Sequence, residues 1–232
     1  MNIFNLVYKP LNLKKNLMTK RILITEDHNV VRLGIVLLIK ELFGDVEIKE
    51  AVDFDTALSY LSDIPFDLMI FDVNIPGGSK TGMVEIIKLR QPGTPILILS
   101  AYSEKLYALR FIKEGADGYI SKDAGTEEIK KAILTVMGGN TYLSAAVQVD
   151  LYHSLQKKNA DHADEILSLS NRELEIVELL IKGYSTNMIA EKLHLQKSTV
   201  STHKAKIFEK LAVQNIPELT LKAEKYFEDR SS

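Results

Sequence analysis

The sequence predicts an α/β fold in which a doubly wound, five-stranded parallel sheet is followed by an all-α helix-turn-helix domain. From residue 21 to about residue 137, short apolar runs alternate with helical patterns, as in a parallel sheet covered by helices. Beyond that point the alternation ends, and from residue 169 the pattern is helical only. The chain has 232 residues, of which 46% are hydrophobic, and this length suits two modest domains.

The sheet is expected to be built from five strand–helix units. In the first helix the apolar residues are spaced four, three and four, which predicts a buried stripe of Val31, Ile35, Leu38 and Leu42. A loop rich in proline and glycine at residues 76–78 leads into the third helix. The strands are expected at 21–25, 46–51, 67–71, 95–99 and 118–121, and the later helices near 55–61, 82–89, 104–114 and 126–136.

Two segments are expected to lie outside the folded domains. Residues 1–17 fit no strand or helix, so we expect a disordered N-terminal extension, with translation starting at Met1 or Met18. A functional N-terminal arm is the alternative. Residues 138–165 resemble a linker, with a helical segment near 144–155 and an almost entirely polar stretch at 156–165. The two domains would then span residues 18–137 and 166–232.

Polar side chains stand where four of the predicted strands end. Glu26-Asp27 follows the first strand, Asp72 the third and Ser100 the fourth, and Lys122 follows the fifth. Because the carboxyl ends of parallel strands meet at one edge of the sheet, these side chains should lie close together. Carboxylates can hold a divalent metal beside a nucleophilic carboxylate, and a cation can stabilise phosphoryl oxygens. The set predicts phosphoryl transfer onto Asp72.

Each of these residues also has an ordinary structural alternative. An aspartate after a strand most often caps a helix or forms a turn, and this applies to Asp72 and to the Glu26-Asp27 pair. Ser100 could cap a helix, and Lys122 could be a solvated lysine. These roles would have to coincide at successive strand ends, so the constellation is more specific than any of its members.

The composition limits the cellular setting. The chain has no cysteine, which excludes disulfides and thiolate metal sites. No apolar stretch approaches the roughly 20 residues that span a bilayer. The apolar run at residues 3–8 is too short and too polar for a signal peptide. We therefore expect a cytoplasmic protein that does not associate with membranes.

The C-terminal helices carry the pattern of a helix-turn-helix. Ser170 and Glu173 have the spacing of a capping box, and Gly183 ends the helix that they begin. Small Ala190 in the next helix would allow close crossing of the two helices. The expected core positions are Leu174, Val177 and Ile181 in the first helix and Val200, Ile207 and Leu211 in the last helix of the motif.

Charge supports a nucleic-acid partner for this motif. Residues 192–210 contain five lysines against one acid, a net charge of +4, whereas the whole chain is at −2. A lysine-rich helix is usually only a solvated face. Here it coincides with the second helix of a helix-turn-helix, where positive charge suits contacts with DNA phosphates.

The strand-end residues resemble those of response-regulator receiver domains, which have a flavodoxin-like fold, over about residues 19–137. The resemblance implies that a histidine kinase phosphorylates Asp72, and that Asp27, Asp72 and the carbonyl of Asn74 bind Mg²⁺, with Glu26 holding the metal through water. Glu26 stands where many receivers have aspartate, an exchange that removes no metal ligand.

The same resemblance assigns the remaining positions of the site. It implies that Lys122 neutralises phosphoryl oxygens and that Ser100 turns inward to bond the phosphoryl group. Tyr119 lies where the family has its rotating aromatic residue, with a half-buried aromatic on an outer strand as the alternative. By resemblance, Asn74 and Tyr102 flank the path of an attacking water and tune dephosphorylation.

The C-terminal sequence resembles the LuxR-type DNA-binding domain over about residues 166–228, through Leu169-Ser170-Asn171-Arg172-Glu173, residues 189–193 and residues 198–203. A receiver followed by this domain is the arrangement of the NarL/FixJ family. Ser201, Thr202 and Ala205 would face the major groove. For His203 a packing role is equally open. The expected DNA-binding set is Lys197, Thr199, Ser201, Thr202, His203, Lys204, Ala205 and Lys206.

The sequence thus predicts a transcriptional response regulator rather than an enzyme. Its expected partners are a cognate histidine kinase, double-stranded DNA and a second copy of itself, with phosphorylation controlling dimerisation and DNA binding. One alternative is a docking receiver joined to a phosphorylation-independent DNA-binding domain. The other is a Mg²⁺-dependent phosphohydrolase, which typically requires a second aspartate where this chain has Asn74.

Overall fold

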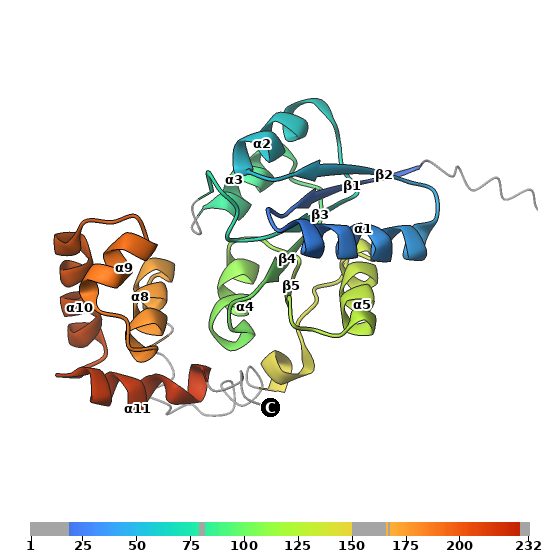
Figure 1. Ribbon diagram of the computed structural model, residues 1–232. Helices are drawn as coiled ribbons and strands as arrows, with labels where there is room; N and C mark the ends of the chain where they lie inside the picture. The colour runs from blue at the N-terminus through green and yellow to red at the C-terminus, as the bar shows by residue number, and fades with distance from the viewer. Residues whose placement is uncertain (1–18, 79–81, 150–165, 167, 228–232) are drawn as a thin grey trace, which may run out of the picture.

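The computed structural model describes residues 19–78, 82–149, 166 and 168–227. Its N-terminal part is a five-stranded, fully parallel sheet with the strand order β2-β1-β3-β4-β5 (Figure 1). The chain runs from β1 to β2 in one direction and then returns to add β3, β4 and β5 on the other side. The order therefore reverses between β1 and β3, and this switch point is where open α/β sheets place their sites. The strands are β1 (Lys20–Thr25), β2 (Val46–Ala51), β3 (Leu68–Phe71), β4 (Ile96–Ser100) and β5 (Gly118–Ser121).

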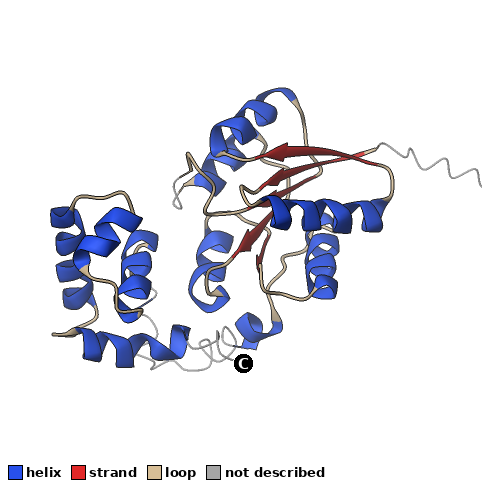
Figure 2. Ribbon diagram, in the orientation of Figure 1, coloured by secondary structure: helices blue, strands red, loops and turns tan. Residues whose placement is uncertain are grey.

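Helices cover both faces of this sheet (Figure 2). Alternate residues of a strand point to opposite faces, so Ile22 and Ile24 of β1 pack under α1 and α5, whereas Leu23 packs under the other three helices. The buried strands are almost entirely apolar, as expected where both faces are covered. The helices are α1 (Asn29–Phe43), α2 (Phe54–Asp63), α3 (Met83–Arg90), α4 (Glu104–Lys113) and α5 (Thr126–Met137).

The predicted strands and helices of the sheet are confirmed to within two residues at each end, but the predicted stripe of α1 is partly wrong. Ile35 is buried as expected, together with Val36 and Ile39, which the prediction omitted. The other three predicted positions are only half-buried at the edge of the core. The buried face is turned because α1 contacts α5 as well as the sheet, which a single-helix pattern does not reveal.

The C-terminal part is helical, with α8 (Asn171–Ile181), α9 (Thr186–Lys192), α10 (Lys197–Lys210) and α11 (Ile216–Phe227). The predicted capping box is present: the Ser170 hydroxyl accepts from the Glu173 amide, and the Glu173 carboxylate accepts from the Ser170 amide. Gly183 adopts a left-handed φ of 80° just after α8, which favours glycine there. The predicted core positions are buried, except for Ile181, which is half-buried.

The domain built on the sheet and the C-terminal helices meet at α4. Two guanidinium nitrogens of Arg110 donate hydrogen bonds to the backbone carbonyls of Leu169 and Ile166, just before α8 begins, the latter at 3.1 Å. Both of these residues are fully buried. Between the two parts, the described chain contains a short helical stretch at 145–149, which overlaps the helix expected near 144–155. The rest of that prediction, the polar stretch at 156–165 and the N-terminal extension lie outside the described residues.

No helix in the described part of the chain is both long enough and apolar enough to cross a membrane.

Candidate metal and phosphoacceptor site

The strand register brings the predicted acidic residues to one edge of the sheet. Thr25 of β1 pairs with Phe71 of β3, so the residues that follow them, Glu26 and Asp72, emerge side by side. The Asp72 amide donates to the Thr25 carbonyl at 2.8 Å and extends this pairing by one residue. On the other side, the Lys122 amide donates to the Ser100 carbonyl at 2.8 Å. The predicted site residues are therefore brought together by backbone pairing.

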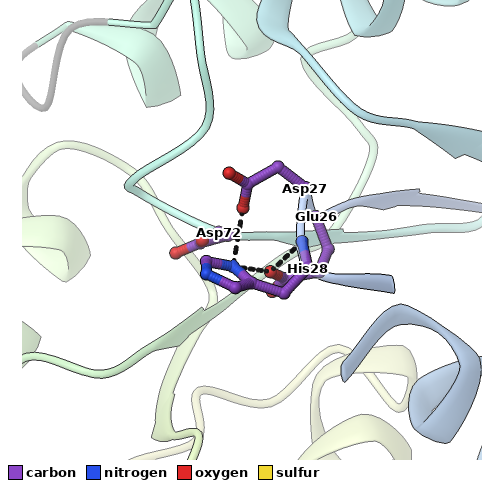
Figure 3. Close-up of side chains that lie close together, drawn as sticks. All are labelled: Glu26, Asp27, His28 and Asp72. Carbon is purple, nitrogen blue, oxygen red and sulfur yellow. Dashed lines mark hydrogen bonds and ion pairs between the residues drawn. The ribbon is translucent and has the colours of Figure 1, made fainter. Parts of the chain in front are cut away.

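A group of potential metal ligands lies at this edge (Figure 3). Glu26, Asp27, His28 and Asp72 each offer one ligand atom, and these atoms lie within 4.8 Å of one another. Asp72 and Glu26 are buried, whereas the Asp27 side chain is 33% exposed. Carboxylate oxygens that converge beside an open side are suitable ligands for Mg²⁺, which binds few carboxylates and retains several waters. The residues present therefore fit a divalent cation.

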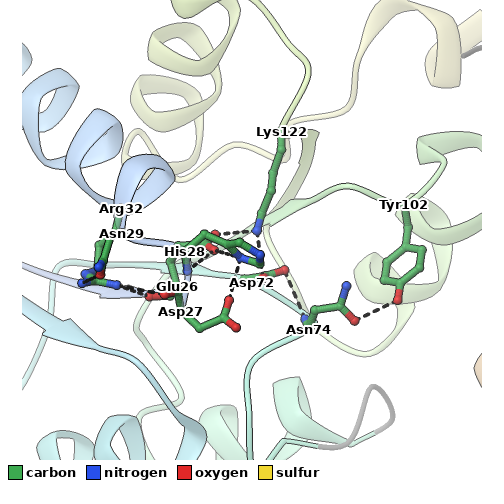
Figure 4. A network of polar contacts seen from close by, with 9 residues as sticks. All are labelled: Glu26, Asp27, His28, Asn29, Arg32, Asp72, Asn74, Tyr102 and Lys122. Atoms are coloured by element: carbon green, nitrogen blue, oxygen red, sulfur yellow. Dashed lines mark hydrogen bonds and ion pairs between the residues drawn. The ribbon is translucent and has the colours of Figure 1, made fainter. Parts of the chain in front are cut away.

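Lys122 reaches into the same group from the end of β5. Its ammonium lies 2.8 Å from Asp72 Oδ2 and 2.6 Å from Glu26 Oε2 (Figure 4). Burial acts to lower the pKa of Lys122, but the hydrogen bonds to the two carboxylates outweigh it, so that the pKa is raised. A permanently charged ammonium therefore stands beside the Asp72 carboxylate, where it can neutralise negative charge that arrives there.

Burial raises the pKa of the Asp72 carboxyl, and the hydrogen bond from Lys122 offsets only part of this effect. The other carboxylate oxygen, Oδ1, accepts from the Asn74 amide at 3.1 Å. Both oxygens of the predicted phosphoacceptor are thus oriented by hydrogen bonds. A role for the Asn74 carbonyl as a metal ligand stays a prediction.

The predicted switch residues form a connected chain of contacts next to the site. The Ser100 hydroxyl is fully buried and accepts from the Tyr102 amide at 3.1 Å. The Tyr119 ring is fully buried, and its hydroxyl donates to the Tyr102 carbonyl at 3.1 Å. The Tyr102 hydroxyl donates in turn to the Asn74 side chain at 2.8 Å. The Tyr119 ring is thus more buried than the half-buried aromatic residue of the alternative interpretation.

Tyr102 also connects the site to α8. It lines a cleft of about 570 Å³ together with Glu178 of α8 and Lys182, the residue that follows this helix. Burial, assisted by the charges of Glu178 and Asp72, raises the pKa of Tyr102 to about 12, despite its hydrogen bond to Asn74. The ring therefore remains a neutral hydrogen-bond donor at physiological pH.

Two residues at this edge were missed by the sequence reasoning. His28 Nδ1 lies 3.0 Å from Glu26 Oε1 and 2.8 Å from Asp27 Oδ1, and these two carboxylates raise the pKa of the imidazole. Arg32, one turn into α1, donates to the Glu26 carbonyl at 2.8 Å. A signal was available for Arg32, because a cation near the positive end of a helix is unfavourable without a partner.

The predicted DNA-binding residues all lie on α10, which is the second helix of the helix-turn-helix. Ser201, Thr202 and Ala205 are exposed, as expected for residues that face a groove. His203 is half-buried and its Nδ1 is fully buried without a hydrogen-bond partner, which favours the packing alternative. Lys197 and Lys206 are exposed, Thr199 is half-buried, and the ammonium of Lys204 lies 5.3 Å from the centre of the Phe208 ring.

Both halves of the chain match known families. The response regulator receiver domain matches residues 22–134, and the luxR family of bacterial regulatory proteins matches residues 167–223. The Fimbriae Z protein of Salmonella typhimurium is 34% identical over 85% of this chain and 93% of that protein. The oxygen regulatory protein NreC of Staphylococcus carnosus is 34% identical over 86% of this chain and 94% of that protein.

The chain is a response regulator of the NarL/FixJ family. It combines a receiver with a LuxR-type DNA-binding domain and acts in transcription regulation, which separates it from the hydrolase alternative. The fold agrees with that of RcsB from Salmonella enterica serovar Typhimurium bound to promoter rprA, at a TM-score of 0.59 and 22% identity over 89% of this chain and 99% of RcsB.

Proposed function

We propose that a histidine kinase phosphorylates this response regulator on Asp72, and that the phosphoryl group controls dimerisation and binding to double-stranded DNA. The observation that carries the proposal is the position of the buried Asp72 carboxylate. It lies 2.8 Å from the Lys122 ammonium and inside the group of acidic ligand atoms. We place this reaction in the cytoplasm, and we retain residues 18–137 and 166–232 as the two domains.

In the proposed reaction an Asp72 oxygen attacks the phosphorus of a phosphohistidine. The phosphorus–nitrogen bond breaks, and the histidine nitrogen keeps the electron pair. Lys122 neutralises the phosphoryl oxygens, because its ammonium already lies at the carboxylate that they approach. Asp27, Asp72 and the Asn74 carbonyl would hold Mg²⁺, with Glu26 behind a water. The cation would supply further charge neutralisation.

The hydroxyls beside the site couple the phosphoryl group to the rest of the protein. Ser100 is bonded to the Tyr102 amide, so a phosphoryl group that draws Ser100 inward breaks this bond. Tyr119 holds the Tyr102 carbonyl from the other side. Tyr102 would then move relative to Glu178 in α8, with which it lines a common cleft. In this way the reaction at Asp72 can reach the DNA-binding domain.

The DNA-binding part of the proposal rests on α10. Its exposed residues Ser201, Thr202 and Ala205 would contact base edges, and Lys197, Lys204 and Lys206 would contact phosphates. RcsB, which has the same fold, was solved as two dimers bound to two parallel DNAs. This chain is 22% identical to RcsB in that structure, over 92% of this chain and all of RcsB, at a TM-score of 0.55. We propose a homodimer on two half-sites for this regulator as well.

The phosphoacceptor is tested with acetyl phosphate and Mg²⁺. We expect intact-mass measurement to show one added phosphoryl group on the wild type and none on Asp72→Asn, because the amide is a poor nucleophile and a weaker metal ligand. Asp63→Asn, the same change at an exposed aspartate, should be labelled normally. Full labelling of Asp72→Asn would refute the assignment. An unlabelled wild type would favour phosphorylation-independent DNA binding.

A further inference from the structure

Arg32 makes four hydrogen bonds around the loop that carries the acidic pair. Nη1 donates to the backbone carbonyls of Glu26 at 2.8 Å and Asp27 at 3.5 Å, and Nη2 donates to Asn29 Oδ1 at 2.5 Å. Nε donates to Glu50 Oε2 in β2 at 2.9 Å. The Arg32 side chain is only 14% exposed. In Figure 4 it lies to the left of the acidic pair, on the side away from Asp72 and Lys122.

These contacts hold backbone that the sheet does not fix. The Glu26 amide still donates to the Ala51 carbonyl at 3.0 Å, but residues 26–28 belong to neither β1 nor α1. The two carbonyls bonded by Arg32 belong to the peptide groups on either side of the Asp27 Cα, and these two peptide groups set the direction of the Asp27 side chain. Hydrogen bonds from a charged donor are roughly twice as strong as neutral ones, so this part of the loop is held firmly.

We propose that Arg32 is a positioning residue for the metal-binding acids. Its guanidinium, anchored by Glu50, fixes the carbonyls of Glu26 and Asp27 so that both carboxylates point toward Asp72. The inference rests on the proposed function, because it assigns these acids to a cation that assists phosphorylation. Residues that orient metal ligands typically contribute 10- to 100-fold to metal affinity, so the effect should be measurable.

The direction in which Mg²⁺ affinity changes when Arg32 is removed distinguishes a positioning role from simple charge repulsion. Arg32 is positively charged and lies close to a site for a cation. If charge alone mattered, its removal would relieve repulsion and strengthen Mg²⁺ binding. If Arg32 positions the ligands, its removal leaves the loop free to adopt other conformations, and Mg²⁺ binding becomes weaker.

The experiment is a calorimetric titration of Mg²⁺ into the unphosphorylated full-length protein. We expect Arg32→Ala to weaken binding by about tenfold or more. Arg32→Lys keeps the charge but offers no planar pair of donors, so a smaller loss is expected. Arg21→Ala is the matched control, because Arg21 forms a similar ion pair from β1 to Glu47 of β2 at the opposite end of the strands. Its Mg²⁺ affinity should equal that of the wild type.

A second measurement follows the rate of phosphorylation by acetyl phosphate as Mg²⁺ is raised. Arg32→Ala should need about tenfold more Mg²⁺ for half of the maximal rate, whereas the maximal rate should stay close to that of the wild type. A general loss of structure would instead lower the maximal rate. If Arg32→Ala does not fold, as judged by circular dichroism, Arg32→Lys carries the test.

Unchanged or tighter Mg²⁺ binding in the folded Arg32 variants would overturn the inference, as would an equal loss in Arg21→Ala. These outcomes differ from a failure of the proposed function. In that case the wild type would not be labelled at Asp72, while the Mg²⁺ titration would still report on Arg32.

Discussion

At the scale of single residues, the site is a balance between buried negative and positive charge. Asp72 and Glu26 are both 1% exposed, and two carboxylates so close together would repel each other without compensation. Lys122 supplies one positive charge between them. A cation at the remaining ligand atoms would complete the compensation.

Tyr102 is the residue whose role can be tested most directly. Its hydroxyl donates to the Asn74 side chain at 2.8 Å, and Asn74 lies between Tyr102 and Asp72 (Figure 4). We expect Tyr102→Ala to shorten the lifetime of the phosphorylated protein roughly two- to tenfold, which corresponds to about 0.4–1.4 kcal/mol of barrier, because water gains access to the phosphorus. The decay of labelled protein measures this lifetime. In Tyr102→Phe the ring remains, and the decay should stay closer to that of the wild type. An unchanged decay in Tyr102→Ala would contradict the role.

At the scale of elements, the sequence predicted what depends on local pattern. The five strands, the capping box of α8 and the buried residues of α10 follow from alternation, spacing and capping, all of which are local. The polar residues at the strand ends were predicted because parallel strands share an edge. The stripe of α1 was partly wrong, since its burial depends on α5, about 90 residues further along the chain.

Contacts between distant segments could not be predicted in the same way. Arg32 bonds to Glu50 across 18 residues, and Arg110 bonds to the Leu169 carbonyl across 59 residues. No spacing rule connects such pairs, because their meeting depends on the packing of whole elements. The family resemblance did not supply them either, since it transferred roles only to the positions of its motifs.

The capping box also makes a prediction about pH. Burial acts to raise the pKa of Glu173, but the ion pair with Lys210 at 2.7 Å and the Ser170 hydrogen bonds outweigh it, so the pKa is lowered. A carboxyl with a lowered pKa stabilises the fold above its unfolded pKa of about 4.3, and this stabilisation is lost as the pH falls through the folded pKa.

We therefore expect Glu173→Gln to lower the free energy of unfolding of the C-terminal domain by about 1–2 kcal/mol at neutral pH, and by much less once the wild-type carboxyl is protonated in acid. Urea denaturation at a series of pH values measures the difference. Glu191→Gln, at an exposed glutamate of α9, should change stability little at any pH. A loss in Glu173→Gln that persists undiminished in acid would show that the charge is not responsible.

At the scale of the whole molecule, the contact between α4 and the start of α8 links the two domains. Arg110 donates hydrogen bonds to the carbonyls of Leu169 and Ile166. Tyr107, on the same helix, is buried, and its pKa is raised mainly by this burial and secondly by the charge of Glu178. The α10 residues Ser201, Thr202 and Ala205 are exposed and take no part in this contact. The contact therefore sets the relative position of the domains without covering the proposed DNA-binding residues.

We expect Arg110→Ala to loosen this arrangement while each domain stays folded. A hydrogen bond to a charged group stabilises by about 1.5–3 kcal/mol, so the loss of this side chain favours separated domains. Small-angle scattering should show a larger radius of gyration than in the wild type. Lys113→Ala, at an exposed position of the same helix, should leave it unchanged. Equal radii for Arg110→Ala and the wild type would show that Arg110 does not hold the domains together.

The surface of α11 sets the expected assembly on DNA. Leu219 and Ala223 are fully buried and complete the core of the domain. Leu221, however, is 73% exposed and is available for a second subunit. A single helix-turn-helix offers a small interface, so a dimer on two half-sites makes binding selective.

We expect the phosphorylated regulator to sediment with an inverted-repeat DNA as two subunits, and Leu221→Asp to bind it as one subunit with lower affinity, because a carboxylate placed in an apolar contact is costly. Leu89→Asp makes the same change at an 83% exposed leucine of α3 and should still bind as two subunits. If Leu221→Asp also binds as two subunits, the dimer interface does not lie on α11. One subunit for the wild type would refute the dimer, because only one half-site of the inverted repeat would then be occupied.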